Sequence, residues 1–185
     1  YQMKVVIVGG VAGGASAAAR LRRLDEQAQI TIYERSGYIS YANCGLPYYI
    51  GGTIQKQAEL TLQTPASFKK RFNIEVKVGH EVQAIDRAKK QVTVCDLASG
   101  QLFQADYDKL ILAPGAQPVR PPLPGVDSSR LYTLRTVEDT LRIREIAASG
   151  QVKSAVVIGG GFIGVEMAEN LRELGLAVSL IQREN

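Results

Sequence analysis

The feature that most constrains the fold is a pattern of strand, glycine turn and helix that occurs twice. In the first copy, the apolar run at residues 4–8 is followed by GGVAGG and then by ASAAARLRRL. In the second copy, residues 154–158 are followed by GGGFIG and then by VEMAENLREL. A further β-branched run follows each helix, at residues 30–34 and 177–181. Each copy therefore predicts the first half of a Rossmann-like βαβ unit that binds a dinucleotide, within an α/β fold.

The two glycine turns predict phosphate-binding loops. A pyrophosphate at a helix N-terminus meets free backbone N–H groups and the positive end of the helix dipole, and its close approach requires turn residues without side chains. The second turn has the complete spacing of such a fingerprint, at Gly159, Gly161 and Gly164. The first turn, residues 9–14, has Val11 where the central glycine is expected. Glycines that serve only close helix–strand packing are the alternative, but two matches in the same context favour nucleotide binding.

The residues at the ends of the second strands predict which nucleotide each unit binds. Glu34 ends this strand in the first unit and is suited to accept hydrogen bonds from ribose hydroxyls. In the second unit Gln182 stands at the corresponding place and Arg183 follows it. Loss of the carboxylate and gain of a cation favour a 2′-phosphate, so we expect NADPH to be used at least as well as NADH. Glu184 would supply the acid if the strand register were shifted by two residues.

The region between the two copies has a different character. Thr64 and Pro65 predict the N-cap and first position of a short helix that ends at residue 72. Three short alternating segments predict a small antiparallel β-meander inserted in the first unit: residues 74–78, 81–86 and 91–95. A buried strand at 110–112, a proline-rich linker at 117–125 and an amphipathic helix at 136–148 then lead to the second copy.

Cys44, in the segment SYANCGLPYY, is the predicted reactive atom. Pro47 and the residues after it predict the first turn of a helix, whose dipole stabilises a thiolate. A buried, inert cysteine is the alternative, but neighbours such as Asn43 and Gly45 are polar or small rather than aliphatic. The second cysteine, Cys95, lies in the alternating run QVTVCDL and is expected to be structural.

The composition argues against several other classes of protein. The net charge is +4 and the basic residues are scattered without interleaved aromatic residues, so nucleic-acid binding is not indicated. No apolar stretch approaches the ~18 residues of a membrane span, and two lone cysteines do not make a secreted disulfide scaffold. We therefore expect a cytoplasmic protein without a metal site. The chain stops just after the second strand of the second copy, which would leave apolar surface bare, so we expect it to be a fragment.

Four segments carry a family resemblance: GGVAGGASAAARLRR, SYANCGLPYYIGG, YDKLILAPGA and GGGFIGVEMAENL. Together they resemble the FAD-dependent pyridine nucleotide–disulfide oxidoreductases. More narrowly, they are similar to the branch of coenzyme A-disulfide reductases, NAD(P)H persulfide reductases and NADH oxidases. Many members of the wider family carry two cysteines separated by four residues. Here Tyr49 stands at the second position, as in the single-cysteine branch.

The resemblance implies roles for particular residues. In the FAD site it implies contacts from Gly9, Gly10, Val11, Ala12, Gly13, Gly14, Glu34, Arg35, Asn43, Val82, Ala113, Pro114 and Gly115. In the NAD(P)H site it implies contacts from Gly159, Gly161, Gly164 and Arg183. Contacts to coenzyme A are implied for Ser16, Arg20, Arg23, Ser40 and Asn43. Arg20 and Arg23 share one helical face and could meet an anionic phosphate together, although a solvated face is the alternative.

The resemblance also implies a reaction and a domain plan. NAD(P)H would reduce FAD, and Cys44 would attack a coenzyme A disulfide, a persulfide or a similar small disulfide to form a mixed disulfide that the flavin resolves. One alternative is an NADH oxidase or peroxidase that cycles Cys44 through sulfenic acid. Another is a nucleotide-binding module without turnover. The expected domains are an FAD-binding segment at 1–116, a linker and crossover helix at 117–150 and the start of an NAD(P)H-binding domain at 151–185. We expect a homodimer for the full-length protein and no turnover by this piece alone.

Overall fold

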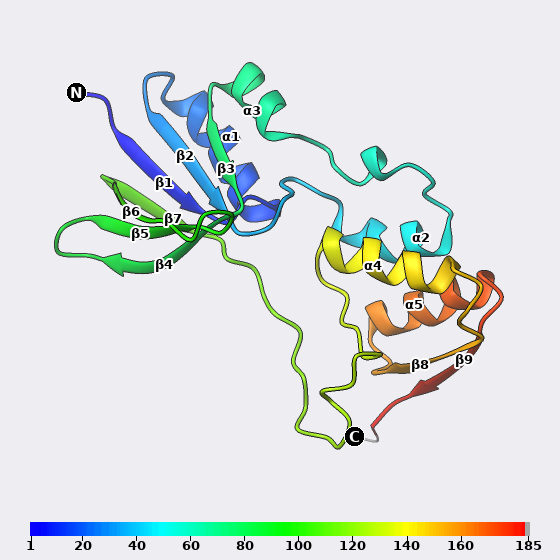
Figure 1. Ribbon diagram of the computed structural model, residues 1–185. Coiled ribbons are helices and arrows are strands. Elements are labelled where there is room, and N and C mark those ends of the chain that lie inside the picture. The colour runs from blue at the N-terminus through cyan, green and yellow to red at the C-terminus, as the bar shows by residue number, and fades with distance from the viewer. Residues whose placement is uncertain (184–185) are drawn as a thin grey trace. The chain divides into compact units, whose positions relative to one another are not determined.

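The structure is a computed structural model that describes residues 1–183. By its internal contacts the chain divides into two compact units, which are described separately (Figure 1). The first unit comprises Tyr1–Tyr41 and Thr61–Ala116, and the second comprises Ala42–Leu60 and the chain from Gln117 onward. The segment that contains Cys44 therefore packs within the second unit. The functional assignment of residues 1–116, 117–150 and 151–185 stays a prediction.

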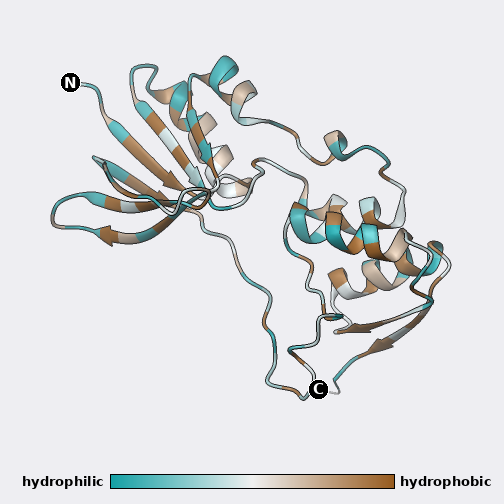
Figure 2. Cartoon of the chain, in the orientation of Figure 1, coloured by the Kyte–Doolittle hydropathy of each residue, from teal (hydrophilic) through white to brown (hydrophobic). Residues whose placement is uncertain are grey.

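The first unit is built on a four-stranded parallel sheet of order β3-β2-β1-β7. Its strands are β1 (Lys4–Val8), β2 (Gln29–Glu34), β3 (Glu75–Val78) and β7 (Lys109–Leu112). Alternate residues of β1 face opposite sides, because a strand has a period of two. Val5 and Ile7 pack in a core with α1 (Ala12–Leu24) and α3 (Pro65–Phe72), while Val6 packs in a second core on the other face. Figure 2 shows the apolar character of these central strands.

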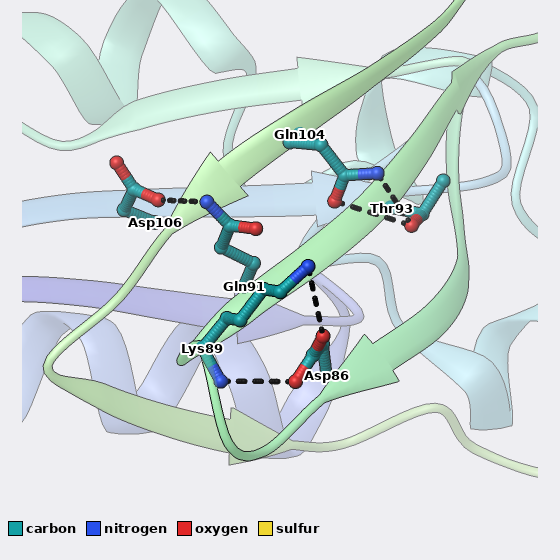
Figure 3. A network of polar contacts seen from close by, with 6 residues as sticks. All are labelled: Asp86, Lys89, Gln91, Thr93, Gln104 and Asp106. Carbon is teal, nitrogen blue, oxygen red and sulfur yellow. Dashed lines mark hydrogen bonds and ion pairs between the residues drawn. The ribbon is translucent and has the colours of Figure 1, made fainter.

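The second face of the sheet is covered by an antiparallel meander of order β4-β5-β6. Its strands are β4 (His80–Asp86), β5 (Gln91–Asp96) and β6 (Leu102–Asp106). Val92 and Val94 of β5 are buried against Val6 and Tyr33. The polar side chains of β5 point the other way and pair across the ladder with those of β6 (Figure 3). Gln91 Nε2 donates to Asp106 Oδ1 at 2.8 Å, and Gln104 Nε2 donates to Thr93 Oγ1 at 3.0 Å.

The prediction of which segments form the meander was wrong in two places. The segment 74–78 belongs to the parallel sheet, where Thr31 of β2 is opposite Glu75 of β3. Gly79, with φ of +66°, ends β3 before β4 begins. The third meander strand is β6, which was not among the predicted strands. A four-residue alternating run fits an edge strand of a parallel sheet as well as it fits a meander, so the pattern alone does not decide its partner.

The second unit combines three helices with two parallel strands. Its elements are the 3₁₀ turn η1 (Asn43–Gly45), α2 (Leu46–Gly51), the 3₁₀ turn η2 (Gln57–Glu59), α4 (Val137–Ala148), β8 (Ser154–Ile158), α5 (Phe162–Glu173) and β9 (Ala177–Ile181). α2 packs against both α4 and α5. The core of this unit contains Ile50 from α2, Ala147 from α4, and Met167 and Leu171 from α5.

The predicted helix starts are confirmed. Thr64 caps α3 and Thr136 caps α4, each in a reciprocal capping box, with Ser67 and Asp139 respectively. Residues 113–135 form neither helix nor strand. No helix within residues 1–183 has the length and hydropathy needed to cross a membrane.

Candidate functional site

The first glycine loop is closed by backbone contacts that leave no space for side chains at two positions. The N–H of Gly9 donates to the carbonyl oxygen of Tyr33 at 2.8 Å, and Gly9 has φ of +94°. A Cβ atom on Gly9 would lie 2.0 Å from the oxygen of Ala113, and one on Gly14 would lie 1.7 Å from the oxygen of Gly9. Both positions therefore require glycine. The loop holds the start of α1 tightly against the ends of β1 and β7.

Glu34 is fixed at this loop by two backbone donors. Gly10 N–H donates to Oε2 at 2.7 Å, and Ser36 N–H donates to Oε1 at 2.8 Å. The side chain is only partly buried. Each carboxylate oxygen has further acceptor capacity, so Glu34 can also accept hydrogen bonds from ribose hydroxyls.

The second loop repeats this geometry. Gly159 has φ of +104° and donates to the oxygen of Ile181 at 2.8 Å, and a Cβ atom on Gly164 would lie 1.8 Å from the oxygen of Gly159. Gln182 Oε1 accepts a hydrogen bond from Gly160 N–H at 2.6 Å. Gln182 thus takes the place that Glu34 has in the first unit. Arg183 follows it and is exposed, whereas Glu184, the alternative acid, lies outside the described residues.

The missing central glycine of the first loop has a simple explanation. Val11 has φ of −92° and its counterpart Gly161 has φ of −71°, so neither position requires the left-handed backbone conformation that favours glycine. A Cβ atom on Gly161 would have no atom within 4 Å. Valine is therefore compatible with this position of the loop.

The N-termini of α1 and α5 differ from those of the other long helices. No side chain caps α1 or α5, whereas α3 and α4 begin with complete capping boxes. The first N–H groups of a helix need acceptors from elsewhere, and a pyrophosphate supplies them. In each unit, the glycine loop, the uncapped helix N-terminus and the hydrogen-bond acceptor at the strand end, Glu34 or Gln182, together fit a dinucleotide.

Cys44 lies in the second unit, on η1 directly before α2, and it is exposed. Pro47 stands in the first turn of α2, as the sequence predicted. The Oδ1 atom of the adjacent Asn43 is buried and has no hydrogen-bond partner among the described residues. Cys95 is buried on β5, as expected for a structural cysteine.

Arg144 of α4 anchors the cysteine segment. Its Nη1 atom donates to the backbone oxygens of Tyr49 at 2.7 Å and Ile54 at 3.2 Å. Its guanidinium also lies over the Tyr49 ring, 4.0 Å from the ring centre. The sequence does not single out Arg144, because one arginine on an amphipathic helix has no distinctive pattern.

The structure brings together only part of the residues predicted for the sites. Glu34 and Ser40 meet Gly10, since Ser40 N–H donates to the Gly10 oxygen at 2.9 Å, and Ala113 lies against Gly9. Asn43 and Cys44 belong to the other unit. The remaining first-unit candidates are distributed as follows: Ser16, Arg20 and Arg23 exposed on α1, Val82 half-buried on β4, Pro114 and Gly115 after β7, and Arg35 in an exposed ion pair with Glu81.

Comparison with known proteins decides the family. The family model for pyridine nucleotide–disulphide oxidoreductases matches residues 3–185. The chain belongs to this family. The family predicted from the four sequence segments is therefore confirmed, and the two Rossmann-like units with their inserted meander agree with it.

Three relatives within this family are particularly similar. A coenzyme A disulfide reductase of Staphylococcus haemolyticus is 44% identical over 180 residues, which cover 97% of this chain and 40% of the relative. The structure of reduced CoADR-RHD from Bacillus anthracis shares 49% identity and a TM-score of 0.97, over 100% of this chain and 33% of that chain. An NAD-dependent persulfide reductase from A. fulgidus shares 38% identity and a TM-score of 0.91, over 96% and 34% of the two chains. The chain thus spans well under half the length of these pyridine nucleotide–disulphide oxidoreductases.

Proposed function

We propose that this chain forms part of an FAD-dependent reductase that uses NAD(P)H to reduce a coenzyme A disulfide, a persulfide or a similar small disulfide through Cys44. The observation that carries the proposal is the exposed sulfur of Cys44 in a chain with two glycine-loop units. The names of the coenzyme A disulfide reductase and persulfide reductase relatives support the sulfur substrate. A thiolate before a helix is also an apt nucleophile for a disulfide.

In this mechanism the residues of the chain bind, orient and attack. Gly9, Gly14 and Glu34 would hold the ADP part of FAD, and Gly159, Gly164 and Gln182 would hold the nicotinamide dinucleotide. The Cys44 thiolate attacks one sulfur of the substrate disulfide, the S–S bond breaks, and the released thiolate takes up a proton. A mixed disulfide between Cys44 and the second thiol results. When bound, FAD would supply the two electrons from NAD(P)H that release this thiol and return Cys44 to the thiolate.

We further infer a preference for NADPH in the second unit. Gln182 offers an amide where a ribose-binding carboxylate would stand, and Arg183 provides an exposed cation beside it. A water-forming NADH oxidase from Lactobacillus brevis shares 34% identity with this chain. Its engineered NADPH-bound variant includes an aspartate changed to alanine and the next alanine changed to arginine. An uncharged residue followed by arginine is what the present chain has.

Coenzyme A binding is proposed for Ser16, Arg20, Arg23, Ser40 and Asn43. Within residues 1–183 Arg20 and Arg23 have no ion-pair partner, and both are exposed on α1. Arg22 on the same helix instead makes hydrogen bonds within the protein: its guanidinium donates to the backbone oxygens of Phe72 and Asn73. The two free cations are therefore available for the phosphates of a coenzyme A substrate. The homodimer and the cytoplasmic location remain predictions from the family resemblance.

An oxidase or peroxidase is the second candidate, and the similarity to the Lactobacillus brevis NADH oxidase favours it. Here the exposed Cys44 would react with an oxygen species and cycle through sulfenic acid. The test is turnover by the full-length protein with coenzyme A disulfide and NADPH, compared with peroxide and NADH. We expect the first pair to give the higher kcat/KM and Cys44→Ser to abolish it. Faster turnover with peroxide would favour the oxidase, and full turnover by Cys44→Ser would contradict both.

A further inference from the structure

Arg144 of α4 holds the segment that follows Cys44 at two points. Its Nη1 atom donates to the backbone oxygen of Tyr49 on α2 at 2.7 Å, and to that of Ile54 in the loop after α2 at 3.2 Å. The guanidinium also lies 4.0 Å from the centre of the Tyr49 ring. Hydrogen bonds from a cation are stronger than those between neutral groups, so these contacts fix the end of α2 and the loop after it on α4.

The loop that Arg144 holds packs directly against the turn that carries the sulfur. A Cβ atom on Gly45, the residue after Cys44, would lie 3.2 Å from Cδ1 of Ile54 and 3.2 Å from Cδ2 of Leu60. Leu60 is fully buried, and its backbone oxygen accepts a hydrogen bond from Ala42 N–H at 2.9 Å. Gly45 N–H donates to the Ala42 oxygen at 3.0 Å. The cysteine turn is thus closed by its own hydrogen bond and bounded by the Ile54 and Leu60 side chains.

The side of α2 that faces α5 is fixed by shape. A Cβ atom on Gly51 would lie 2.1 Å from Oδ1 of Asn170, so this position of α2 has no space for a side chain. Asn170 is buried, and its Nδ2 atom donates to the Glu166 backbone oxygen within α5 at 2.8 Å. Because α2 has no room to move toward α5, a loss of hydrogen bonds on the α4 side should be taken up by the loop at 52–54 and by the cysteine turn.

We propose that Arg144 is a positioning residue for the redox sulfur. It holds the backbone of Tyr49 and Ile54 on α4, which keeps the Ile54 side chain against Gly45 and so fixes the turn of Cys44. This inference rests on the proposed function of Cys44. Arg144 acts through the loop rather than on the reacting atoms, and a displacement of the sulfur by about 1 Å can lower the rate of attack by about a hundredfold.

Two activities of the full-length holoenzyme separate this role from a general loss of structure. Reduction of coenzyme A disulfide by NADPH requires the sulfur, whereas reduction of ferricyanide by NADPH requires only the flavin and the nicotinamide nucleotide. We expect Arg144→Ala to lower kcat for the disulfide by about tenfold or more and to leave ferricyanide reduction unchanged. The absorbance of the thiolate–flavin band in the reduced enzyme should fall as well, because that band depends on the placement of the sulfur.

Two further variants of α4 refine the comparison. Arg144→Lys should recover part of the disulfide turnover and of the band, because an ammonium can still donate to a backbone oxygen but lacks the planar guanidinium. Arg142→Ala removes an exposed arginine from the same helix and should match the wild type in both activities. Equal losses of disulfide and ferricyanide turnover in Arg144→Ala, or wild-type disulfide turnover, would overturn the inference.

If Arg144→Ala cannot be purified with flavin, Arg144→Lys and Ile54→Val decide the question. Ile54→Val removes the Cδ1 atom that lies against Gly45 and keeps the backbone oxygen that Arg144 binds. Both variants should lose disulfide turnover and keep ferricyanide turnover, and wild-type disulfide turnover in both would reject the role of Arg144.

Cys44→Ser in the same two assays separates this result from a failure of the proposed function. Disulfide turnover that survives in Cys44→Ser rejects the proposed function. Disulfide turnover that is lost in Cys44→Ser but kept in Arg144→Ala rejects only the positioning role.

Discussion

Glu34 and Gln182 occupy the same place in the two units. Each accepts a hydrogen bond from the second glycine of its loop: Gly10 N–H lies 2.7 Å from Glu34 Oε2, and Gly160 N–H lies 2.6 Å from Gln182 Oε1. The backbone contact is kept, and only the charge differs. An acid at this position is suited to ribose hydroxyls, and an uncharged residue next to a cation is suited to a 2′-phosphate, so we expect the two residues to select different nucleotides.

A change of charge at Gln182 or Arg183 should change the preference of the second unit between NADPH and NADH. In the full-length enzyme, Gln182→Glu should lower kcat/KM for NADPH by about tenfold relative to NADH, because the new carboxylate repels the 2′-phosphate. Arg183→Ala should act in the same direction. Arg172→Ala removes a similarly exposed arginine from α5 and serves as the control. Steady-state kinetics with both nucleotides measure the ratio, and an unchanged ratio in both Gln182→Glu and Arg183→Ala would reject the assignment.

Alanine at one constrained glycine of each loop should separate the two nucleotide sites. The added Cβ would lie 1.7 Å from the Gly9 oxygen in Gly14→Ala, and Gly159→Ala would place a side chain at a backbone φ of +104°. We expect Gly14→Ala to be purified with little FAD, as judged from flavin absorbance per protein. Gly159→Ala should keep FAD and lose affinity for NADPH. Gly100→Ala, in the turn between β5 and β6, is the control, since Gly100 has a φ of +72° but no atom within 4 Å of its Cβ position. Normal flavin content in Gly14→Ala would contradict the placement of FAD on the first loop.

The arginines of α1 should divide into a substrate-binding pair and a structural residue. Arg20→Ala should raise KM for coenzyme A disulfide by about tenfold with little change in the melting temperature, because a charge-assisted contact to a phosphate is lost. Arg22→Ala should lower the melting temperature, since the Phe72 and Asn73 oxygens lose their donor. Kinetics and thermal unfolding of the two variants provide the comparison. A KM unaffected by both Arg20→Ala and Arg23→Ala would show that they form only a solvated face.

Arg144 should stabilise the segment that carries Cys44. Its replacement by alanine leaves the backbone oxygens of Tyr49 and Ile54 without this donor, so we expect a loss of about 2 kcal/mol in the free energy of unfolding. Arg144→Lys should recover only part of this, because an ammonium lacks the planar face that lies over the Tyr49 ring. Denaturant unfolding measures both. Wild-type stability in Arg144→Ala would show that the contacts to α2 contribute little.

Local patterns predicted the strands and helices that follow strong rules. The runs at 4–8, 154–158 and 177–181 are β1, β8 and β9 with the expected bounds. Thr64 caps α3 as predicted, and the amphipathic helix predicted at 136–148 is α4. The segment 74–78 was wrongly assigned to the meander, because a short alternating run does not indicate which strand it pairs with. It contains β3, which pairs with β2. Partner choice depends on long-range contacts, which the order of residues alone does not reveal.

In the candidate sites, too, local patterns could be predicted from the sequence and long-range contacts could not. The equivalence of Gln182 with Glu34 could be predicted, because strand and loop lengths fix the register. The role of Arg144 could not be predicted, because it comes from the packing of α2 against α4. Arg144 and its partner Tyr49 lie 95 positions apart in the chain. No sequence spacing connects them.

We propose Cys44 as the redox sulfur of a flavin-dependent reductase, and the visible spectrum of the full-length protein during titration with NADPH tests this for wild type and Cys44→Ser. We expect a long-wavelength band in the reduced wild type, from a thiolate next to the flavin, and its loss in Cys44→Ser. A wild type that shows no such band, or a variant that retains it, would rule out this role of Cys44.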